Sequence, residues 1–322
     1  MEMTIDNRPL VEMKNLKKYF KTSNGSLHAV DDINLSIKKG TTLGVVGESG
    51  CGKSTLGRTI LRLTPHTSGE VLFKGENILE YDKKKMRLLR QQMQMIFQDP
   101  YSSLNPRNTV YQLIAEQLVV NKIYKSKVEL EERVMHLMNT VGLDERYVNT
   151  YPHELDGGRR QRIGLARAIS MNPEFIVCDE PVSALDVSIQ AQILNLLMDL
   201  QEKMGLTYMF ITHDLSVVKH ISDEIAVLYV GQCIEKAPSK ELFENPMHPY
   251  TKMLLSAIPV PALRKDGFKR EIIKGEVTNP IDPKPGCRFA ARCKYCTPQC
   301  IGENLELKEK TPNHFVMCRL YE

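Results

Sequence analysis

The segment from residue 47 to residue 54 constrains this chain more than any other, because it matches the phosphate-binding pattern G-x-x-x-x-G-K-[ST] at every specified position. Its glycines allow backbone N–H groups to turn toward a β-phosphate. Lys53 supplies a cation for the β- and γ-phosphates, and Ser54 offers a hydroxyl to Mg²⁺. The apolar run at 43–46 predicts a buried strand before the loop, and the apolar spacing after Ser54 predicts a helix that ends at Pro65. Because such a helix points its N-terminus at an anion, we expect a nucleoside triphosphate to bind here.

Two carboxylates follow a second apolar run. Residues 175–178 are Phe-Ile-Val-Cys, and Asp179 and Glu180 come directly after them. On a buried strand of an open α/β sheet, Asp179 would emerge at the carboxyl end, where ligands bind. Asp179 suits Mg²⁺, and Glu180 suits positioning or deprotonating an attacking water. A pair of acids after a strand is often only solvated, but its combination with the phosphate-binding motif favours a functional role.

The order of predicted elements indicates an α/β fold. Strands are predicted at 35–37, 43–46, 94–97, 175–178 and 208–211, and helices at 110–120 and 128–141. Alternation of this kind favours a sheet with mainly parallel strands. The 322 residues are 42% hydrophobic and 25% charged, which is enough apolar material for a sizeable core. Around residue 246 the chain changes to a proline-punctuated stretch with one predicted helix at 250–258.

A third motif lies between the phosphate-binding loop and the paired acids. Residues 155–162 read Leu-Asp-Gly-Gly-Arg-Arg-Gln-Arg, and Ala-Arg-Ala follows at 166–168. This segment resembles the signature motif of ABC ATPases, and the other family motifs occur in the proper order over residues 10 to about 245. Gln98 resembles the Q-loop glutamine, the Ser-Ala-Leu-Asp run at 183–186 the D-loop, and His213 the switch histidine. Phe20, with Tyr19 as the alternative, lies where the family stacks an aromatic ring on adenine.

The resemblance implies ATP and Mg²⁺ as ligands and gives roles to particular residues. Those expected to act in hydrolysis are Gln98, Glu180 and His213, and those expected to hold Mg²⁺ are Ser54, Gln98 and Asp179. The residues expected to contact ATP are Phe20, Gly47, Glu48, Ser49, Gly50, Cys51, Gly52, Lys53, Ser54, Thr55, Asp156, Gly157, Gly158, Arg159, Asp179 and Asp186.

The resemblance also implies an architecture and partners. Residues 1–245 would form a P-loop NTPase of the ABC type, with a RecA-like core, an antiparallel β subdomain and a helical subdomain at about 99–164. Two such domains pair head to tail, so that each ATP lies between the phosphate loop of one chain and the signature motif of the other. ATP-driven pairing would be coupled to two transmembrane permease subunits, and indirectly to an extracytoplasmic solute-binding protein.

The signature motif departs from the family pattern at two positions. Asp156 replaces the usual serine and Arg159 the usual glutamine. Asp156 is a good helix N-cap, contributing about 1 kcal/mol. A carboxylate about 4 Å from a phosphate charge would nevertheless cost about 4 kcal/mol at an effective dielectric constant near 20. One hypothesis is that the ATP site completed by this signature hydrolyses slowly, which favours a paralogous ATPase over a second copy as partner. The alternative is a variant compensated by Arg159, with ordinary activity.

The end of the chain resembles a second, narrower family feature. His-Pro-Tyr-Thr at 248–251 and the Gly-Cys-Arg-Phe-x-x-Arg-Cys pattern at 286–293 look like the C-terminal extension of oligopeptide and dipeptide transporter ATPases. The extension would cover 246–322. Because related nickel importers share it, import of peptides is the first expectation and import of nickel or another small solute the alternative.

Five of the eight cysteines lie in this extension. In a reducing compartment such a cluster indicates metal binding before disulfides. In relatives the recurring cysteines match Cys287, Cys293, Cys300 and Cys318, an arrangement that resembles a [4Fe–4S] site, with Cys296 as a spare. Zinc and free thiols remain alternatives. A segment with few apolar residues would gain folding free energy from the metal.

Other protein classes fit less well. No apolar run of 18 residues is present, and the first ten residues lack the apolar core of a secretory signal, so we expect a peripheral protein on the cytoplasmic face of the membrane. The net charge of +4 indicates a mixed surface. No basic stripe with interleaved aromatics favours a nucleic-acid partner. A soluble ABC ATPase without a transport role, or an exporter subunit, would not explain the extension.

Overall fold

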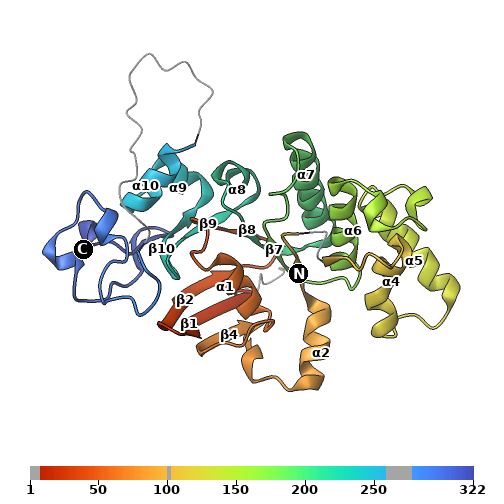
Figure 1. Cartoon of the computed structure of the whole chain (residues 1–322), viewed down its shortest axis with the longest axis horizontal. Coiled ribbons are helices and arrows are strands. Elements are labelled where there is room, and N and C mark those ends of the chain that lie inside the picture. Colours follow the sequence, from red (N-terminus) through yellow and green to blue (C-terminus); the bar gives the residue numbers. More distant parts are fainter. Residues whose placement is uncertain (1–7, 100–102, 259–277) are drawn as a thin grey trace, which may run out of the picture. The chain divides into compact units, whose positions relative to one another are not determined.

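The computed structural model describes residues 8–99, 103–258 and 278–322. These residues divide into two compact units. Figure 1 labels their helices and strands where there is room. The first comprises residues up to 38, residues 42–80 and residues from 211 onward. The second comprises residues 39–41 and 81–210. The first unit therefore holds both the phosphate-binding loop and the described part of the C-terminal extension.

An antiparallel sheet opens the first unit. Its strands lie in the order β2-β1-β4-β5, with bounds β1 Val11–Thr22, β2 Gly25–Ile37, β4 Ser68–Phe73 and β5 Glu76–Asn77. A two-residue turn joins β1 to β2, because Thr22 pairs directly with Gly25. Buried residues alternate with more exposed ones, with local interruptions, over residues 11–18 of β1 and 30–37 of β2, as expected for a sheet with one face on the core.

A second set of strands carries the ligand-binding loop of the first unit. The order is β11-β12-β10-β9-β3, where β3 is Thr42–Val46, β9 Glu224–Tyr229, β10 Gln232–Pro238, β11 Lys308–Thr311 and β12 His314–Val316. Strand β3 is parallel to β9, whereas the β9–β10, β10–β12 and β11–β12 pairs are antiparallel. The extension thus adds two strands to the sheet that precedes the phosphate loop. The helices of this unit are α1 Lys53–Ile60, α8 Leu215–Ile221, α9 Ser239–Glu244 and α10 Pro249–Ser256.

The second unit contains the strands in the order β8-β7-β6. Strand β6 is Met93–Ile96, β7 is Phe175–Asp179 and β8 is Thr207–Ile211, with the last residue of β8 assigned to the first unit. Strands β6 and β7 are parallel. The helices are α2 Lys83–Gln92, α4 Val110–Val120, α5 Lys127–Thr140, α6 Gly157–Ile169 and α7 Val187–Met204. Every residue of β7 and β8 is buried, as their apolar runs predict.

Most predicted elements are confirmed, with one clear error at the end of α1. The helix ends at Ile60 and does not continue to Pro65. Arg62 takes a left-handed φ of 52°, and the N–H groups of Leu63 and Thr64 both donate to the carbonyl of Arg58. This closure ends the helix before the proline is reached. The predicted helix at 250–258 is confirmed as the shorter α10.

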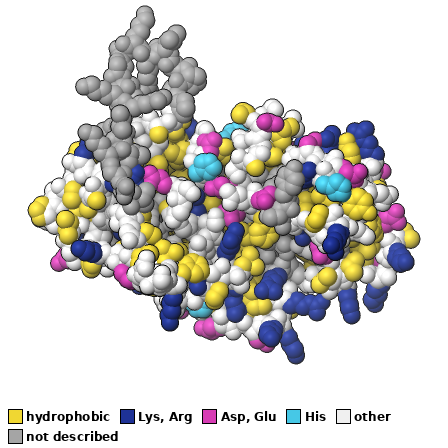
Figure 2. All heavy atoms as spheres, in the orientation of Figure 1, with side chains coloured by type: hydrophobic (Ala, Val, Ile, Leu, Met, Phe, Trp, Pro, Cys, Tyr) yellow, Lys and Arg dark blue, Asp and Glu magenta, His cyan; other side chains and the backbone are white. Residues whose placement is uncertain are grey.

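Among the described residues, no helix is both long enough and apolar enough to cross a membrane. Basic, acidic and hydrophobic side chains all occur on the face that Figure 2 shows, in keeping with the net charge of +4.

Candidate nucleotide site

The residues predicted to act on ATP divide between the two units. The phosphate-binding loop, Phe20 and His213 belong to the first unit. Gln98, the signature motif and the paired acids after β7 belong to the second.

Two glycines of the loop are required by close backbone approach. Gly47 has φ 153°, and a Cβ built on it would lie 2.2 Å from the carbonyl oxygen of Leu228. Gly52 has φ 103°, and its Cβ would lie 1.9 Å from the carbonyl oxygen of Ala29. Any side chain at either position would collide with backbone, so the loop conformation depends on glycine there.

Lys53 folds back over the loop that precedes it. Its ammonium donates to the carbonyl oxygens of Gly47 at 2.7 Å and Glu48 at 2.9 Å, and the residue is only 5% exposed. The lysine cation is therefore held at the loop by backbone oxygens, ready for a phosphate group. Cys51 is buried beside it, and burial raises the pKa of the Cys51 thiol while Lys53 opposes the shift. Ser54 and Thr55 follow on the first turn of α1.

Glu48, predicted to contact ATP, has its side chain engaged by the extension. Its carboxylate accepts two hydrogen bonds from the guanidinium of Arg292, each 2.9 Å long. Its backbone N–H donates to the Tyr250 hydroxyl at 2.9 Å. Sequence reasoning gave neither Arg292 nor Tyr250 a role, although both lie in the segments that resemble the transporter extension. That resemblance was the only signal for either residue.

The two candidate aromatic residues near the end of β1 differ in availability. Tyr19 stacks on His28 with ring centroids 3.8 Å apart, and its hydroxyl donates to Asp31. Phe20 is 36% exposed, with the Lys18 ammonium 4.4 Å from its ring centroid. Phe20 is therefore the ring with a free face, as adenine stacking requires.

The acidic pair of the second unit lies at the end of β7, as predicted. Asp179 is the last residue of this strand and is fully buried. Glu180 follows with a left-handed φ of 47°. The side-chain amide of Gln98 donates to the Glu180 carboxylate at 2.8 Å. The predicted Q-loop glutamine and the predicted catalytic glutamate are thus brought together within one unit.

The signature motif opens α6. Asp156 is the N-cap, and its carboxylate accepts the backbone N–H of Arg159 at 2.8 Å. The guanidinium of Arg159 also pairs with this carboxylate and lies over the ring of Tyr147, 4.9 Å from its centroid. Gly157 and Gly158 form the first turn of the helix. The two residues that depart from the family pattern therefore bond to each other.

The other predicted residues lie at exposed element ends. Asp186 is the N-cap residue of α7 without a side-chain cap bond, and His213 directly follows Thr212 after β8. Ser49 and Gly50 are exposed at the tip of the phosphate-binding loop. These positions leave the side chains or backbone groups accessible to a ligand.

Four of the five extension cysteines line one cavity. It has a volume of about 90 Å³ and is bordered by Cys287, Cys293, Cys300 and Cys318, while Cys296 is exposed and absent from its lining. The backbone joins two of the segments, because the Cys287 N–H donates to the Cys300 carbonyl at 2.8 Å. Within the described parts of the chain, no three His, Cys, Asp or Glu side chains are close enough to hold a single metal ion.

Comparison with known families matches two segments of the chain. The ABC transporter model matches residues 30–183. The model described as the oligopeptide/dipeptide transporter C-terminal region matches residues 234–300.

Curated relatives match almost the whole chain. The oligopeptide transport ATP-binding protein AppF of Bacillus subtilis is 48% identical, over 99% of this chain and 100% of the relative. The oligopeptide transport ATP-binding protein OppF of the same organism is 53% identical over 96% of each chain. The dipeptide transport ATP-binding protein DppF of Escherichia coli is 45% identical, over 94% of this chain and 92% of its own.

Solved structures match part of the chain. The ATP-binding cassette MJ0796, in a dimer bound to ADP and phosphate, has a TM-score of 0.65 and 30% identity, covering 71% of this chain and 98% of its own. CbiO1 from Clostridium perfringens has a TM-score of 0.66 and 29% identity, covering 74% and 92%. The fold is thus that of an ABC ATPase, and this chain belongs to the ABC transporter ATP-binding proteins of the oligopeptide/dipeptide family.

Proposed function

We propose that this protein is the ATP-hydrolysing subunit that powers import of oligopeptides or dipeptides across the cytoplasmic membrane. The observation that carries the proposal is a complete phosphate-binding loop, with Lys53 held over it, in a chain similar along its length to peptide transport ATP-binding proteins. Import of nickel or another small solute is the alternative, because cargo is chosen by subunits other than the ATPase.

The candidate site residues suit distinct steps of hydrolysis. The loop backbone and Lys53 bind the phosphates, and Phe20 offers a face to adenine. Ser54, Gln98 and Asp179 are suitable oxygen ligands for Mg²⁺, which would neutralise phosphate charge when bound. Glu180 orients or deprotonates the attacking water, and its hydrogen bond from Gln98 holds the carboxylate in place. His213 and Asp186 are assigned to the site because they resemble the switch histidine and the D-loop aspartate of the family.

The proposed assembly has two ATPase subunits and two transmembrane permease subunits on the cytoplasmic face of the membrane. The partner ATPase closes the phosphate loop of this chain with its own signature motif. A paralogue is favoured over a second copy, because two copies would both carry Asp156 and Arg159. Within the chain, we propose residues 1–245 as the ATP-binding domain, with its helical subdomain at about 99–164, and 246–322 as the extension.

Transport in reconstituted vesicles tests the function. Vesicles containing the permease pair and this ATPase should take up a labelled short peptide when Mg·ATP is supplied on the cytoplasmic side. Lys53→Ala should abolish ATP binding and uptake, since a phosphate-binding cation is lost. Lys240→Ala is the matched control, because that side chain is 86% exposed. Uptake that is unchanged by Lys53→Ala would refute the proposal, and uptake of Ni²⁺ but not peptide would support the alternative cargo.

We further propose that the extension holds a [4Fe–4S] cluster on Cys287, Cys293, Cys300 and Cys318. The support is a cavity lined by these four thiols, with Cys296 outside it. A cluster binds each thiolate at a different iron and so needs ligands spaced more widely than the four around one Zn²⁺ ion at about 2.3 Å. The group would act as a structural clamp.

Iron analysis tests the cluster. Protein purified without oxygen should be brown and contain iron and acid-labile sulfide in equal amounts. Cys318→Ser should lose the iron, whereas Cys296→Ser should retain it. Colourless protein without iron, or equal loss in both variants, would disprove the assignment, and stoichiometric zinc would identify the other metal.

A further inference from the structure

We propose that Arg292 and Tyr250, both in the C-terminal extension, are positioning residues for the phosphate-binding loop. Both act on Glu48, the second residue of the loop. The extension would then set the affinity of the loop for nucleotide, in addition to any role in assembly. The inference rests on the ATP-binding role proposed for the loop.

Arg292 holds the Glu48 side chain by a bidentate ion pair. Nη1 and Nη2 each donate to one carboxylate oxygen at 2.9 Å, and the arginine side chain is 3% exposed. Two parallel bonds fix the direction of the carboxylate as well as its distance, which a single bond would not do. The guanidinium also donates to the Tyr229 hydroxyl at 3.3 Å. Glu48 is thereby kept in one orientation.

The ion pair also offsets the negative charge of the Glu48 carboxylate. Glu48 lies in a loop built to bind a polyanion, and an unpaired carboxylate there would repel the phosphates. Arg292 neutralises this charge from the side of the extension. Lys53 binds the carbonyl oxygen of Glu48, so its own charge remains available to the ligand. Loss of Arg292 would therefore weaken nucleotide binding in two ways, by freeing the loop and by exposing a negative charge.

Tyr250 fixes the backbone of the same residue. Its hydroxyl accepts the Glu48 N–H at 2.9 Å, and its side chain is fully buried. The ring packs against Tyr229 and Phe289, with centroids 4.7 and 5.5 Å away. Phe289 belongs to the extension and Tyr229 to β9. Because the Tyr250 ring packs against both, its hydroxyl is held in place. Side chain and backbone of Glu48 are thus both bound by residues from outside the loop.

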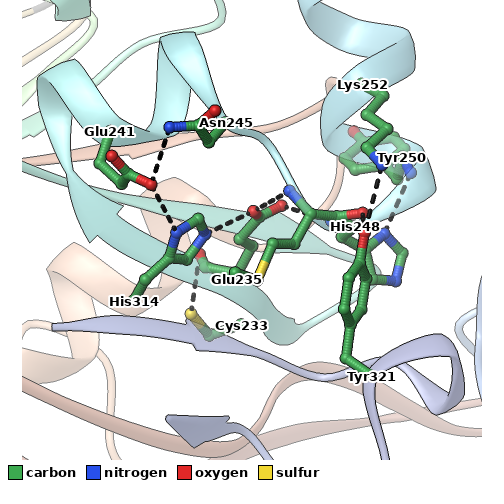
Figure 3. Close-up of polar contacts among 10 residues, drawn as sticks. Cys233, Glu235, Glu241, Asn245, His248, Tyr250, Lys252, His314 and Tyr321 are labelled. Carbon is green, nitrogen blue, oxygen red and sulfur yellow. Dashed lines mark hydrogen bonds and ion pairs between the residues drawn. The ribbon is translucent and has the colours of Figure 1, made fainter. Parts of the chain in front are cut away.

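The helix that carries Tyr250 is itself anchored by a buried carboxylate. Figure 3 shows Glu235 of β10 at the centre of this network. It accepts the backbone N–H groups of Met247 at 2.6 Å and His248 at 2.9 Å, and it contacts His314 Nε2 of β12 at 2.8 Å. His248 caps α10 by accepting the Tyr250 N–H at 3.0 Å. Burial lowers the pKa of His248 to about 4, so the neutral imidazole makes this cap.

The extension contains a matched control for the proposed contacts. Arg288 is 8% exposed and bonds to Asp31 and to the carbonyl oxygen of Val230. It therefore joins the extension to the same unit through a buried guanidinium, whose hydrogen bonds go to Val230 and Asp31 rather than to Glu48. A substitution there loosens the extension while it leaves the Glu48 contacts of Arg292 and Tyr250 in place. The comparison separates positioning of the loop from general stabilisation.

Nucleotide affinity of the full-length chain provides the test, measured by titration with Mg·ATP and accompanied by a melting temperature for each variant. We expect Arg292→Gln to raise the dissociation constant about 10-fold, equivalent to about 1.4 kcal/mol. Tyr250→Phe, which keeps the ring but removes the hydroxyl, should raise it about 3-fold. Arg292→Lys should recover part of the loss, because it restores the charge but not the bidentate geometry. Arg288→Gln should lower the melting temperature but leave the affinity within about 2-fold of the wild type.

The possible results separate this inference from the proposed function. If the wild-type chain binds no Mg·ATP, both the function and the inference are wrong. If the wild type binds but Arg292→Gln and Tyr250→Phe bind equally well, only the positioning role is wrong. An equal loss of affinity in Arg288→Gln would also overturn it, because the effect would then follow from a loosened extension.

Discussion

The guanidinium of Arg159 pairs with the carboxylate of Asp156 at the start of α6, so the two unusual residues of the signature motif neutralise each other. The same carboxylate caps the helix through the Arg159 N–H. The pairing is the arrangement that the compensated alternative for the motif requires, since the carboxylate is not left as a bare charge. It also engages Arg159 on its own chain, so the guanidinium must leave Asp156 before it can bind the ATP of a partner.

The pair predicts strong coupling between the two positions. Arg159→Gln alone should lower ATP turnover of the assembled transporter by about 10-fold, because it leaves the Asp156 charge near the phosphates. Asp156→Ser combined with Arg159→Gln should restore turnover to at least the wild-type level. Steady-state hydrolysis by the four members of this cycle measures the coupling. Additive effects would mean that the pair has no role at the ATP site.

Replacement of Glu180 should separate binding from hydrolysis. Glu180→Gln keeps the size of the side chain but removes the base, so turnover should fall about 100-fold or more while Mg·ATP still binds. Single-turnover hydrolysis and equilibrium binding measure the two quantities. Glu202→Gln, on the exposed part of α7, is the control. Retained turnover in Glu180→Gln would assign the base to another residue.

Thiol reactivity should distinguish Cys51 from Cys296. Burial raises the pKa of Cys51, so less thiolate is present near pH 8 than for an ordinary cysteine, and the side chain is only 5% exposed. We expect alkylation of exposed Cys296 to be at least about 10-fold faster. Raising the pH should speed modification of Cys51, and Mg·ATP should slow it. Mass spectrometry of timed samples measures both alkylation rates. Equal rates would show that the Cys51 thiol is not protected by burial.

The Glu235 network should contribute to the stability of the first unit. Glu235→Gln replaces one of the two acceptor oxygens by an NH₂ donor, so that one of the two backbone N–H groups faces a donor, which should cost about 2–4 kcal/mol of unfolding free energy. Urea denaturation measures the change. Glu241→Gln is the control, since Glu241 is at the partly exposed edge of the network. A difference below 0.5 kcal/mol between the two variants would show that the carboxylate is dispensable, because that is about the effect of an ordinary surface change.

Local patterns were enough to predict much of the nucleotide chemistry. The phosphate-binding loop, the buried strands that precede Gly47 and Asp179, and the helix that begins at Lys53 all follow from short runs of residues. Such features depend on steric freedom, apolar periodicity and helix-end dipoles, which act over a few residues. The same is true of the Asp156 cap, which lies three residues from its donor.

Contacts between distant segments were decided only by the tertiary structure. No local pattern predicts that Arg292 binds Glu48, 244 positions earlier, or that the Tyr250 hydroxyl accepts the N–H of that same residue. The sequence did not reveal that β12 extends the sheet of β10. The four cysteines that line one cavity were named beforehand only through the resemblance to relatives, and their meeting at one cavity comes from the structure. The physical reason is that an ion pair or a cavity requires side chains from separate segments to meet, and their meeting depends on the packing of the whole unit.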